Sequence, residues 1–213
     1  MKKNIFSKIH LRKNYQKINL IHSKGISLVI VLLILVIVSI LGVASIQISR
    51  MATQSARNER DTQIAWQAAE AALLDAELDI LGMPSTSTSR GDVFDKKNTQ
   101  LAMFLEDCGT EGKNKGLCIA KSSGTPNWLR IDFLATSNQQ YVEFGEFTSR
   151  TFQSGSPGIQ PAHNPRYIIE ILDDPNIEKT KSVQNRKYIY RITAIGFGPD
   201  EKTQVVLQSI YRN

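Results

Sequence analysis

The stretch from residue 24 to residue 81 constrains the fold more than any other part of the chain. It opens with a Lys-Gly junction, is uncharged and mostly apolar from Gly25 to Ser49, and turns polar at Arg50. At 1.5 Å per residue, residues 26–49 form a helix about 36 Å long, which is enough to cross a hydrocarbon core of about 30 Å. The sequence therefore predicts a membrane-spanning helix over residues 26–49.

The same helix is expected to continue well beyond the membrane. No proline occurs between Ile26 and Met83, and the second half is rich in Ala, Gln, Glu, Leu and Arg, which favour helices. Gly82 and Pro84 then supply a C-terminal stop. We expect one helix from Ile26 to Leu81 that leaves the lipid and enters water or a bundle of other helices.

Charge places the two ends of this helix on opposite sides of the membrane. The formal net charge is +6, but residues 1–25 hold seven Lys or Arg and no acid, which leaves 19 basic and 20 acidic residues in the rest. Positive charge beside an apolar span keeps that flank in the cytoplasm. The C-terminal part is therefore expected in the periplasm of a bacterium, and nucleic acid is not expected as a primary partner.

The residues that carry enzyme and metal chemistry are scarce. His10 and His22 lie in the basic N-terminal segment, which leaves His163 and two cysteines for the rest of the chain. A structural zinc site or a catalytic triad would need more of these groups together. The acidic pairs at 173–174 and 200–201 lack the oxygen spacing of a calcium loop. No catalytic residue, metal or cofactor is predicted, and the chain is not expected to be an enzyme.

Three features together resemble the class III signal and body plan of type IV pilins and pseudopilins: the basic leader ending in Gly25, the apolar helix that turns polar, and a β-rich C-terminal head. Two further stretches resemble the PilX family of minor type IV pilins, namely residues 65–77 (AWQAAEAALLDAE) and 190–212 (YRITAIGFGPDEKTQVVLQSIYR). The resemblance implies an α+β, pilin-like fold in which the long N-terminal helix packs on a C-terminal antiparallel sheet. It divides the chain into a leader (1–25), a transmembrane part (26–49), a polar and then amphipathic part of the helix (50–81) and a periplasmic head (82–213).

The same resemblance implies a structural function in filament assembly. Together with other minor pilins, the protein would prime the type IV pilus and sit at or near its tip, supporting twitching motility and adhesion. Its partners would be other minor pilins, the major pilin, the prepilin peptidase and the inner-membrane assembly platform. It would be a single-pass inner-membrane protein before assembly and part of the surface fibre afterwards. Two alternatives remain open: a pseudopilin of the type II secretion tip complex, and a signal-anchored periplasmic binding domain.

The resemblance also predicts how the start of the helix is processed and gives meaning to the residue at position 30. Leader cleavage after Gly25 and N-methylation of Ile26 are expected, although residues 42–44 also mimic a signal-peptidase site and an uncleaved anchor is a further alternative. Most pilins carry a glutamate at the position of Ile30. That carboxylate pairs with the N-terminal ammonium of a neighbouring subunit, so Ile30 suggests a subunit with no predecessor, at the tip. Alternatively, Ile30 merely reflects tolerance of an apolar residue.

The second half of the helix shows two apolar stripes at helical spacing. The alanine stripe comprises Ala65, Ala69, Ala72, Ala76 and Ile80 with Leu73, and the leucine stripe comprises Ala71, Leu74, Leu78 and Leu81. We expect the leucine stripe to pack on the sheet and the alanine stripe to approach a neighbouring helix, an assignment that is open to reversal. The acids between the stripes are expected to face solvent or another subunit: Glu70 and Glu77 on one border, Asp75 and Asp79 on the other.

In the head, residues 84–91 read as a loop and 98–107 as a short amphipathic helix. Cys108 and Cys118 bracket a Gly- and Lys-rich turn and are expected to form a disulfide, with a pair of free thiols as the alternative.

The Pro-rich 149–165 loop is expected to be either a surface that contacts a partner or a flexible connection without a function of its own. Strands are predicted by alternation and β-branched content at 128–135, 141–147, 166–172, 187–197 and 203–211, with the last two forming a hairpin.

Overall fold

The computed structural model describes residues 26–153, 155–157, 159–175 and 187–212, so Gly25 and the rest of the leader lie outside the described residues. The helix α1 spans Ile26–Leu81. It ends where predicted: Gly82 follows with a φ of +67°, the left-handed conformation that closes helices. Residues up to Ala52 form one compact unit and residues from Thr53 onward form the other. The two units are described separately.

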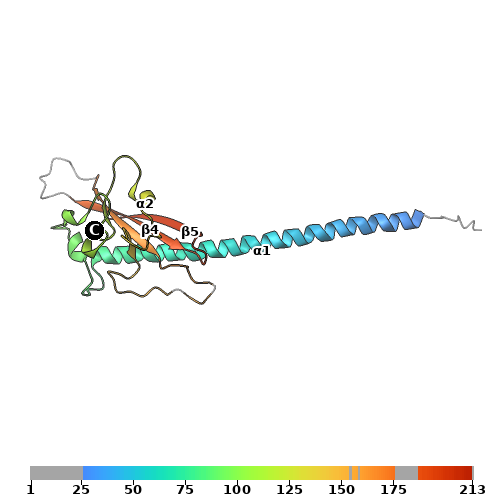
Figure 1. Cartoon of the computed structure of the whole chain (residues 1–213), viewed down its shortest axis with the longest axis horizontal. Helices are drawn as coiled ribbons and strands as arrows, with labels where there is room; N and C mark the ends of the chain where they lie inside the picture. Colours follow the sequence, from blue (N-terminus) through green and yellow to red (C-terminus); the bar gives the residue numbers. More distant parts are fainter. Residues whose placement is uncertain (1–25, 154, 158, 176–186, 213) are drawn as a thin grey trace, which may run out of the picture. The chain divides into compact units, whose positions relative to one another are not determined.

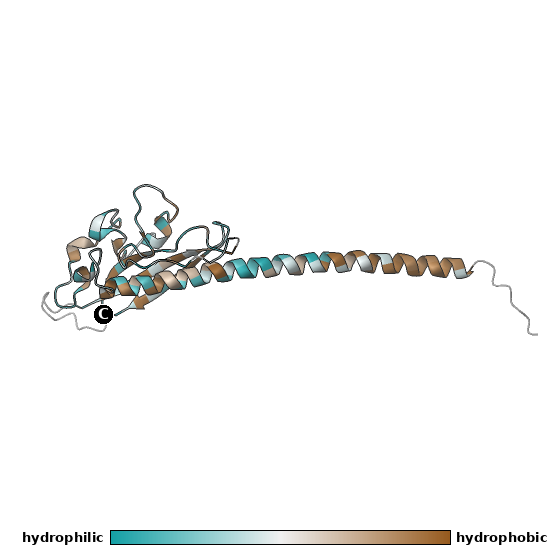
Figure 2. Ribbon diagram, turned by 90° about the horizontal axis from the view of Figure 1, so that it is seen from below, coloured by the Kyte–Doolittle hydropathy of each residue, from teal (hydrophilic) through white to brown (hydrophobic). Residues whose placement is uncertain are grey.

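The first unit is the apolar part of α1. All its described residues are exposed to solvent, and the most apolar 18-residue window of α1 reaches a mean hydropathy of 3.4. The mostly brown colouring of the N-terminal part of α1 in Figure 2 reflects its predominantly apolar sequence. Its large apolar side chains, from Ile26 to Ile48, are all exposed. A helix that is apolar all round requires an apolar environment. This part of α1 is therefore compatible with a single-pass membrane anchor, and it is long enough for that role.

The second unit packs the remainder of α1 against a sheet of five described strands (Figure 1). The strands are β1 (Leu117–Ile119), β2 (Val142–Glu143), β3 (Arg166–Asp173), β4 (Tyr188–Phe197) and β5 (Gln204–Tyr211). Their order is β1-β3-β4-β5, and β2 pairs with β3. β3, β4 and β5 form an antiparallel meander, whereas β1 runs parallel to β3. The expected α+β, pilin-like arrangement is confirmed, with a mixed rather than a purely antiparallel sheet.

The three long strands were all predicted, whereas the shorter elements differ from prediction. The strand expected at 128–135 is wrong, because a short helix, α2 (Asn127–Arg130), and a loop occupy these residues. The strand at 141–147 shrinks to the two residues of β2. The remaining described helices are single 3₁₀ turns: η1 (Gly91–Phe94), η2 (Leu101–Met103) and η3 (Gly112–Asn114).

The helix expected at 98–107 is also wrong, since only the turn η2 forms there. After it the chain becomes extended, and the backbone N–H of Ile119 donates to the carbonyl of Leu105 at 2.9 Å. This pairing with β1, followed by the disulfide at Cys108, requires an extended backbone that a continued helix would prevent. Local amphipathic spacing was outweighed by a contact from further along the chain.

The alanine stripe, not the leucine stripe, packs on the sheet. Ala65, Ala69, Ala72 and Ala76 are fully buried, whereas Leu74 is 51% exposed. The reason lies in β4: a Cβ built on Gly196 would lie 2.0 Å from the carbonyl oxygen of Ala65. Helix and strand backbones approach so closely that only small side chains fit between them. The expected assignment of the two stripes was therefore the wrong way round.

Two apolar clusters fill the two faces of the sheet. Because side chains alternate along a strand, Tyr167 and Ile169 join the cluster beneath α1, while Ile168 joins the other. The first cluster includes the rings of Phe94, Phe104 and Tyr190, with centroids 5.3–6.2 Å apart. The second lies under the loops of residues 108–141 and contains both cysteines, Phe133 and Phe197. β3 and β4 are thus covered on both faces.

Candidate functional site

The predicted processing site lies at the start of α1. Gly25 falls outside the described residues, so cleavage after it remains a prediction. Ile26 is the first described residue of α1, and Ile30 lies one turn further on; both side chains are exposed. The first turn of the helix holds no acidic residue. No charged side chain on this turn opposes burial of Ile26 and Ile30 among lipid chains or neighbouring helices.

A second apolar surface lies on the outward side of α1 in the second unit. We call it the outer stripe: Trp66, Leu74 and Leu81, which are 48%, 51% and 47% exposed. The indole N–H of Trp66 donates to Glu70 at 2.7 Å, which fixes the ring along the helix. These positions follow helical spacing on the side opposite the buried alanines. In the second unit α1 therefore buries one side in its own head and presents Trp66, Leu74 and Leu81 outward, interspersed with Glu70 and Glu77.

A buried ion pair fastens α1 to the chain that follows it. Asp79 and Arg90 are both inaccessible, and the Nη2 of Arg90 lies 2.6 Å from an oxygen of Asp79. The Nε of Arg90 donates to both Asp79 oxygens at 3.0 Å, and the hydroxyl of Tyr167 donates to Asp79 at 2.9 Å. Arg90 also donates to the carbonyls of Lys113 and Lys115. One arginine thus joins the helix, the loop after it and the disulfide loop.

The guanidinium of Arg90 also lies over an aromatic ring. Its central carbon is 3.7 Å from the centroid of Phe147, a distance at which cation–π attraction is strong. Tyr167 beneath the pair is completely buried, and burial raises the pKa of its hydroxyl well above 10. Tyr167 therefore remains a hydrogen-bond donor to Asp79 at all physiological pH values.

A second buried carboxylate lies one turn earlier on α1. Asp75 accepts hydrogen bonds from the Thr148 hydroxyl at 2.6 Å and from the Gly145 backbone N–H at 2.8 Å, and its carboxylate is 3.4 Å from Arg150. Burial raises the pKa of the Asp75 carboxyl. The hydrogen bonds from Thr148 and Gly145 and the positive charge of Arg150 partly offset that rise. Asp75 connects α1 to the 145–150 segment as Asp79 connects it to Arg90.

The solvent-facing role expected for Asp75 and Asp79 is therefore wrong. Both carboxylates point into the head, because Thr148, Arg90 and Tyr167 bring donors to them from distant parts of the chain. One signal was present in the sequence: each acid directly precedes a residue of the alanine stripe, namely Ala76 and Ile80. Once that stripe faces the sheet, its neighbouring acids are carried to the edge of the buried face.

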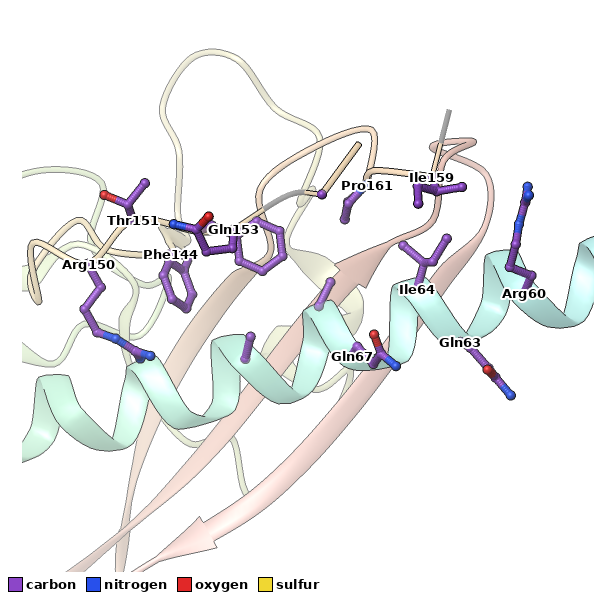
Figure 3. Close-up of a pocket in the computed structure, with 14 residues that line it drawn as sticks. Arg60, Gln63, Ile64, Gln67, Phe144, Arg150, Thr151, Gln153, Ile159 and Pro161 are labelled. Carbon is purple, nitrogen blue, oxygen red and sulfur yellow. The ribbon is translucent and has the colours of Figure 1, made fainter. Parts of the chain in front are cut away.

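The 149–165 loop borders a groove along α1. Its described part and the helix enclose 620 Å³. Figure 3 shows Ile64 of α1 pointing toward Ile159 and Pro161 of the loop, with Arg150 reaching down to the helix at the far end. Gln63 and Gln67 add amide groups on the helix side. The groove combines apolar side chains with the amides of three glutamines and the guanidinium groups of Arg60 and Arg150. Whether a partner occupies it remains a prediction.

The disulfide is confirmed. Cys108 and Cys118 are bonded, ten residues apart, and both are buried in the second apolar cluster. The bond closes the loop that supplies the two carbonyls to Arg90. Among the described residues, no three His, Cys, Asp or Glu side chains lie together as metal ligands would.

Two family models match this chain, one over its N-terminal part and one over its C-terminal part. The model described as PilX N-terminal matches residues 24–74, and the model described as Type IV pilus assembly protein PilX C-term matches residues 114–213. No curated protein and no solved structure matches the chain. The first match covers most of α1 and the second covers all the described strands. The chain belongs to the PilX family of type IV pilus assembly proteins.

Proposed function

We propose that the protein is a minor pilin that, with other minor pilins, primes the type IV pilus and stays at or near the tip of the filament. Its role is structural. Before assembly the apolar part of α1 rests in the inner membrane, with the head in the periplasm. On assembly it exchanges lipid for the helices of neighbouring pilins. The prepilin peptidase first cleaves after Gly25 and methylates Ile26.

The observation that carries this proposal is the apolar surface along α1. Residues 26–49 are exposed on every side, and further along the outer stripe of Trp66, Leu74 and Leu81 is exposed as well. Covering a leucine that is half exposed stabilises a contact by about 1 kcal/mol at 25 cal/mol per Å². Contacts of this size along several turns are sufficient to hold a subunit in a helical bundle.

Ile30 supports a place at the tip. A carboxylate at this position stabilises a pilin by pairing with the N-terminal ammonium of a neighbour, and an unpaired one in the bilayer costs a few kcal/mol. A subunit that has no predecessor gains nothing from it. Ile30→Glu is therefore expected to leave piliation unchanged or reduce it, and increased piliation would contradict a tip position.

A clean deletion tests the function. We expect surface pili and twitching to be lost while the cellular amount of the major pilin stays normal. Complementation with Leu74→Lys should restore few pili, because the charge lies on the outer stripe. Leu129→Lys should restore them, because Leu129, which is 60% exposed and therefore at least as accessible as Leu74, lies on α2 and not on the outer stripe. Normal pili in the deletion strain would refute the proposal, whereas a secretion defect with normal pili would identify a type II secretion pseudopilin.

Leader cleavage and retention of the apolar helix are tested separately, by the N-terminus of the mature protein. The mature protein should begin at Ile26 in cells that contain the prepilin peptidase, and should retain its leader in cells without it. Intact mass spectrometry of the detergent-extracted protein distinguishes these forms. A mature chain that begins at Ser45 would show cleavage by signal peptidase and would remove the membrane helix.

A further inference from the structure

The guanidinium of Arg90 has two sides, which bind different parts of the chain. Its Nε and Nη2 donate to Asp79, on the last turn of α1, at 2.6 to 3.0 Å. Its Nη1 donates to the backbone carbonyls of Lys113 and Lys115, at 3.0 and 2.6 Å. The Arg90 side chain is completely inaccessible, so water cannot replace these acceptors. Loss of the two carbonyls would leave donors of a buried cation unpaired.

The two carbonyls come from the middle of the loop that the disulfide closes. We call residues 109–117 the disulfide loop. Its cysteines are ten residues apart in the sequence, and Lys113 lies midway between them. The loop contains three glycines, at 109, 112 and 116, and glycine has the largest backbone freedom of any residue. Local sequence alone does not hold the carbonyls in place.

Gly109 transmits the position of Cys108 to these carbonyls. It forms a β-bridge with Lys115, and its carbonyl accepts a hydrogen bond from the Gly116 N–H at 2.9 Å. A Cβ built on Gly109 would lie 2.1 Å from the carbonyl oxygen of Asn114, so the two sides of the loop are in direct contact. The stretch that faces Arg90 therefore rests on the residue next to Cys108.

Cys108 itself has a backbone conformation that residues other than glycine rarely adopt. Its φ is +60°, in the left-handed region. The bond to Cys118, a fully buried residue of β1, holds it there. Without that bond, Cys108 would gain stability by returning to a negative φ, and this change would turn the chain at Gly109 away from Lys115. Arg90 would then lose its acceptors in the loop.

We propose that the disulfide is a redox-sensitive lock on the end of α1. Oxidation of Cys108 and Cys118 fixes the carbonyls that hold Arg90, and Arg90 then holds Asp79. Reduction releases Arg90 and, with it, the last turn of α1. The effect crosses the sheet, because both cysteines belong to the second apolar cluster, whereas α1 packs on the first. The lock is a property of the head and does not depend on the function proposed above.

The chemistry of the lock is thiol–disulfide exchange with a disulfide-bearing oxidoreductase. The thiolate of one cysteine attacks the disulfide of the oxidant, which forms a mixed disulfide and releases one thiolate of the oxidant. The thiolate of the other cysteine then attacks the protein sulfur of the mixed disulfide, which forms the Cys108–Cys118 bond and releases the oxidant as a dithiol. Two electrons and two protons pass from the cysteines to the oxidant. Both cysteines are buried in the folded head, so a dithiol reaches the finished bond only when the second cluster opens.

Trypsin cleavage after Arg90 tests the lock in the full-length protein, purified in detergent. Trypsin must take the arginine side chain into its own pocket, so a buried Arg90 is cleaved only after it is released. The parent is compared with Cys108→Ser/Cys118→Ser, and cleavage after Arg191, inside β4, reports global unfolding. We expect the double substitution to increase the cleavage rate after Arg90 by a factor roughly ten times larger than the factor after Arg191.

The other outcomes of this comparison overturn the proposal. An equal increase at both sites would show that loss of the bond only lowers the global stability. No increase after Arg90, or an increase smaller than that after Arg191, would show that Arg90 stays held without the disulfide.

A thermodynamic cycle supplies an independent measurement, again on the full-length protein. Arg90→Lys keeps the charge, but a single ammonium lacks the planar fork that serves Asp79 and two carbonyls together. Urea unfolding gives the equilibrium constant for folding with and without the two cysteines. Their loss should lower this constant roughly a hundredfold in the parent, but only about tenfold or less in Arg90→Lys.

Val205→Ala is the matched control for the cycle. Val205 lies on β5, at the opposite edge of the sheet from β1, so its truncation destabilises the head without touching the disulfide loop. In this background the loss of the cysteines should still cost roughly a hundredfold. Equal effects in the parent and in Arg90→Lys, or an equally reduced effect in Val205→Ala, would overturn the proposal. The trypsin comparison does not require that Arg90→Lys folds.

Discussion

Replacing Arg90 by methionine tests how α1 is held to the head. Methionine keeps most of the volume but removes the charge. Asp79 would then remain fully buried with only the Tyr167 hydroxyl as donor, and the carbonyls of Lys113 and Lys115 would lose theirs. A buried charge that loses its partner destabilises a protein by about 3–5 kcal/mol. That is a large share of the 5–15 kcal/mol typical of a whole domain, so Arg90→Met is expected to be close to unfolding at 37 °C.

The double variant Asp79→Leu/Arg90→Met separates charge pairing from simple packing. If the two positions were independent, the losses would add to about 6–10 kcal/mol. The Lys113 and Lys115 carbonyls have already lost their donor in Arg90→Met. Relative to that variant, the double variant removes the unpaired buried charge of Asp79 and adds only the unpaired Tyr167 hydroxyl, at about 1–3 kcal/mol. The double variant should therefore be no less stable than Arg90→Met.

Urea unfolding of residues 53–213, followed by the fluorescence of Trp66 and Trp128, measures these differences. The parent, both single variants and the double variant complete a thermodynamic cycle, and Lys113→Met serves as the control. Lys113 forms an exposed ion pair with Asp92, so its loss should cost less than about 1 kcal/mol. The reasoning is refuted if Arg90→Met costs no more than Lys113→Met, or if the two single losses simply add.

Three further substitutions test the helix contact, the buried carboxyl and the disulfide. Gly196→Ala should lower the free energy of unfolding by about 3 kcal/mol, because the new methyl would collide with the Ala65 carbonyl; an unchanged urea midpoint would mean that the backbones are not in tight contact. Burial raises the pKa of Asp75, so its ionisation opposes folding as the pH rises above its ordinary 3.8; Asp75→Asn should therefore gain stability relative to the parent between pH 4 and pH 7, and a constant difference in unfolding free energy would contradict this. Cys108→Ser/Cys118→Ser should lose about 3 kcal/mol, as should the parent in reductant, and equal urea midpoints with and without reductant would contradict a structural role of the bond.

Much of the fold follows from local sequence. The run from Ile26 to Leu81 contains no proline and ends at Gly82, so the length of α1 could be read directly. The strands at 166–173, 188–197 and 204–211 are long enough for their alternation and β-branched content to stand out. The disulfide followed from two cysteines around a Gly-rich turn. In each case the determining interactions lie within a few residues along the chain.

Other parts of the fold depend on contacts between distant residues. β1 is three residues long and forms only because β3 pairs beside it, while the alternation at 128–135 is overridden by α2 and its loop. Short segments carry too little local preference to resist tertiary packing. This is why their predicted types were wrong while the long elements were right.

The sequence alone determined that α1 is a continuous helix with an uncharged, mostly apolar part over residues 26–49 and two apolar stripes in its second half, because periodicity and composition are local properties. It did not determine which stripe is buried. That was decided by Gly196, more than a hundred residues beyond the alanines, which lets the strand backbone approach the helix until only small side chains fit. The same packing turned Asp75 and Asp79 toward donors that no local pattern could locate, and left Leu74 and Leu81 facing outward.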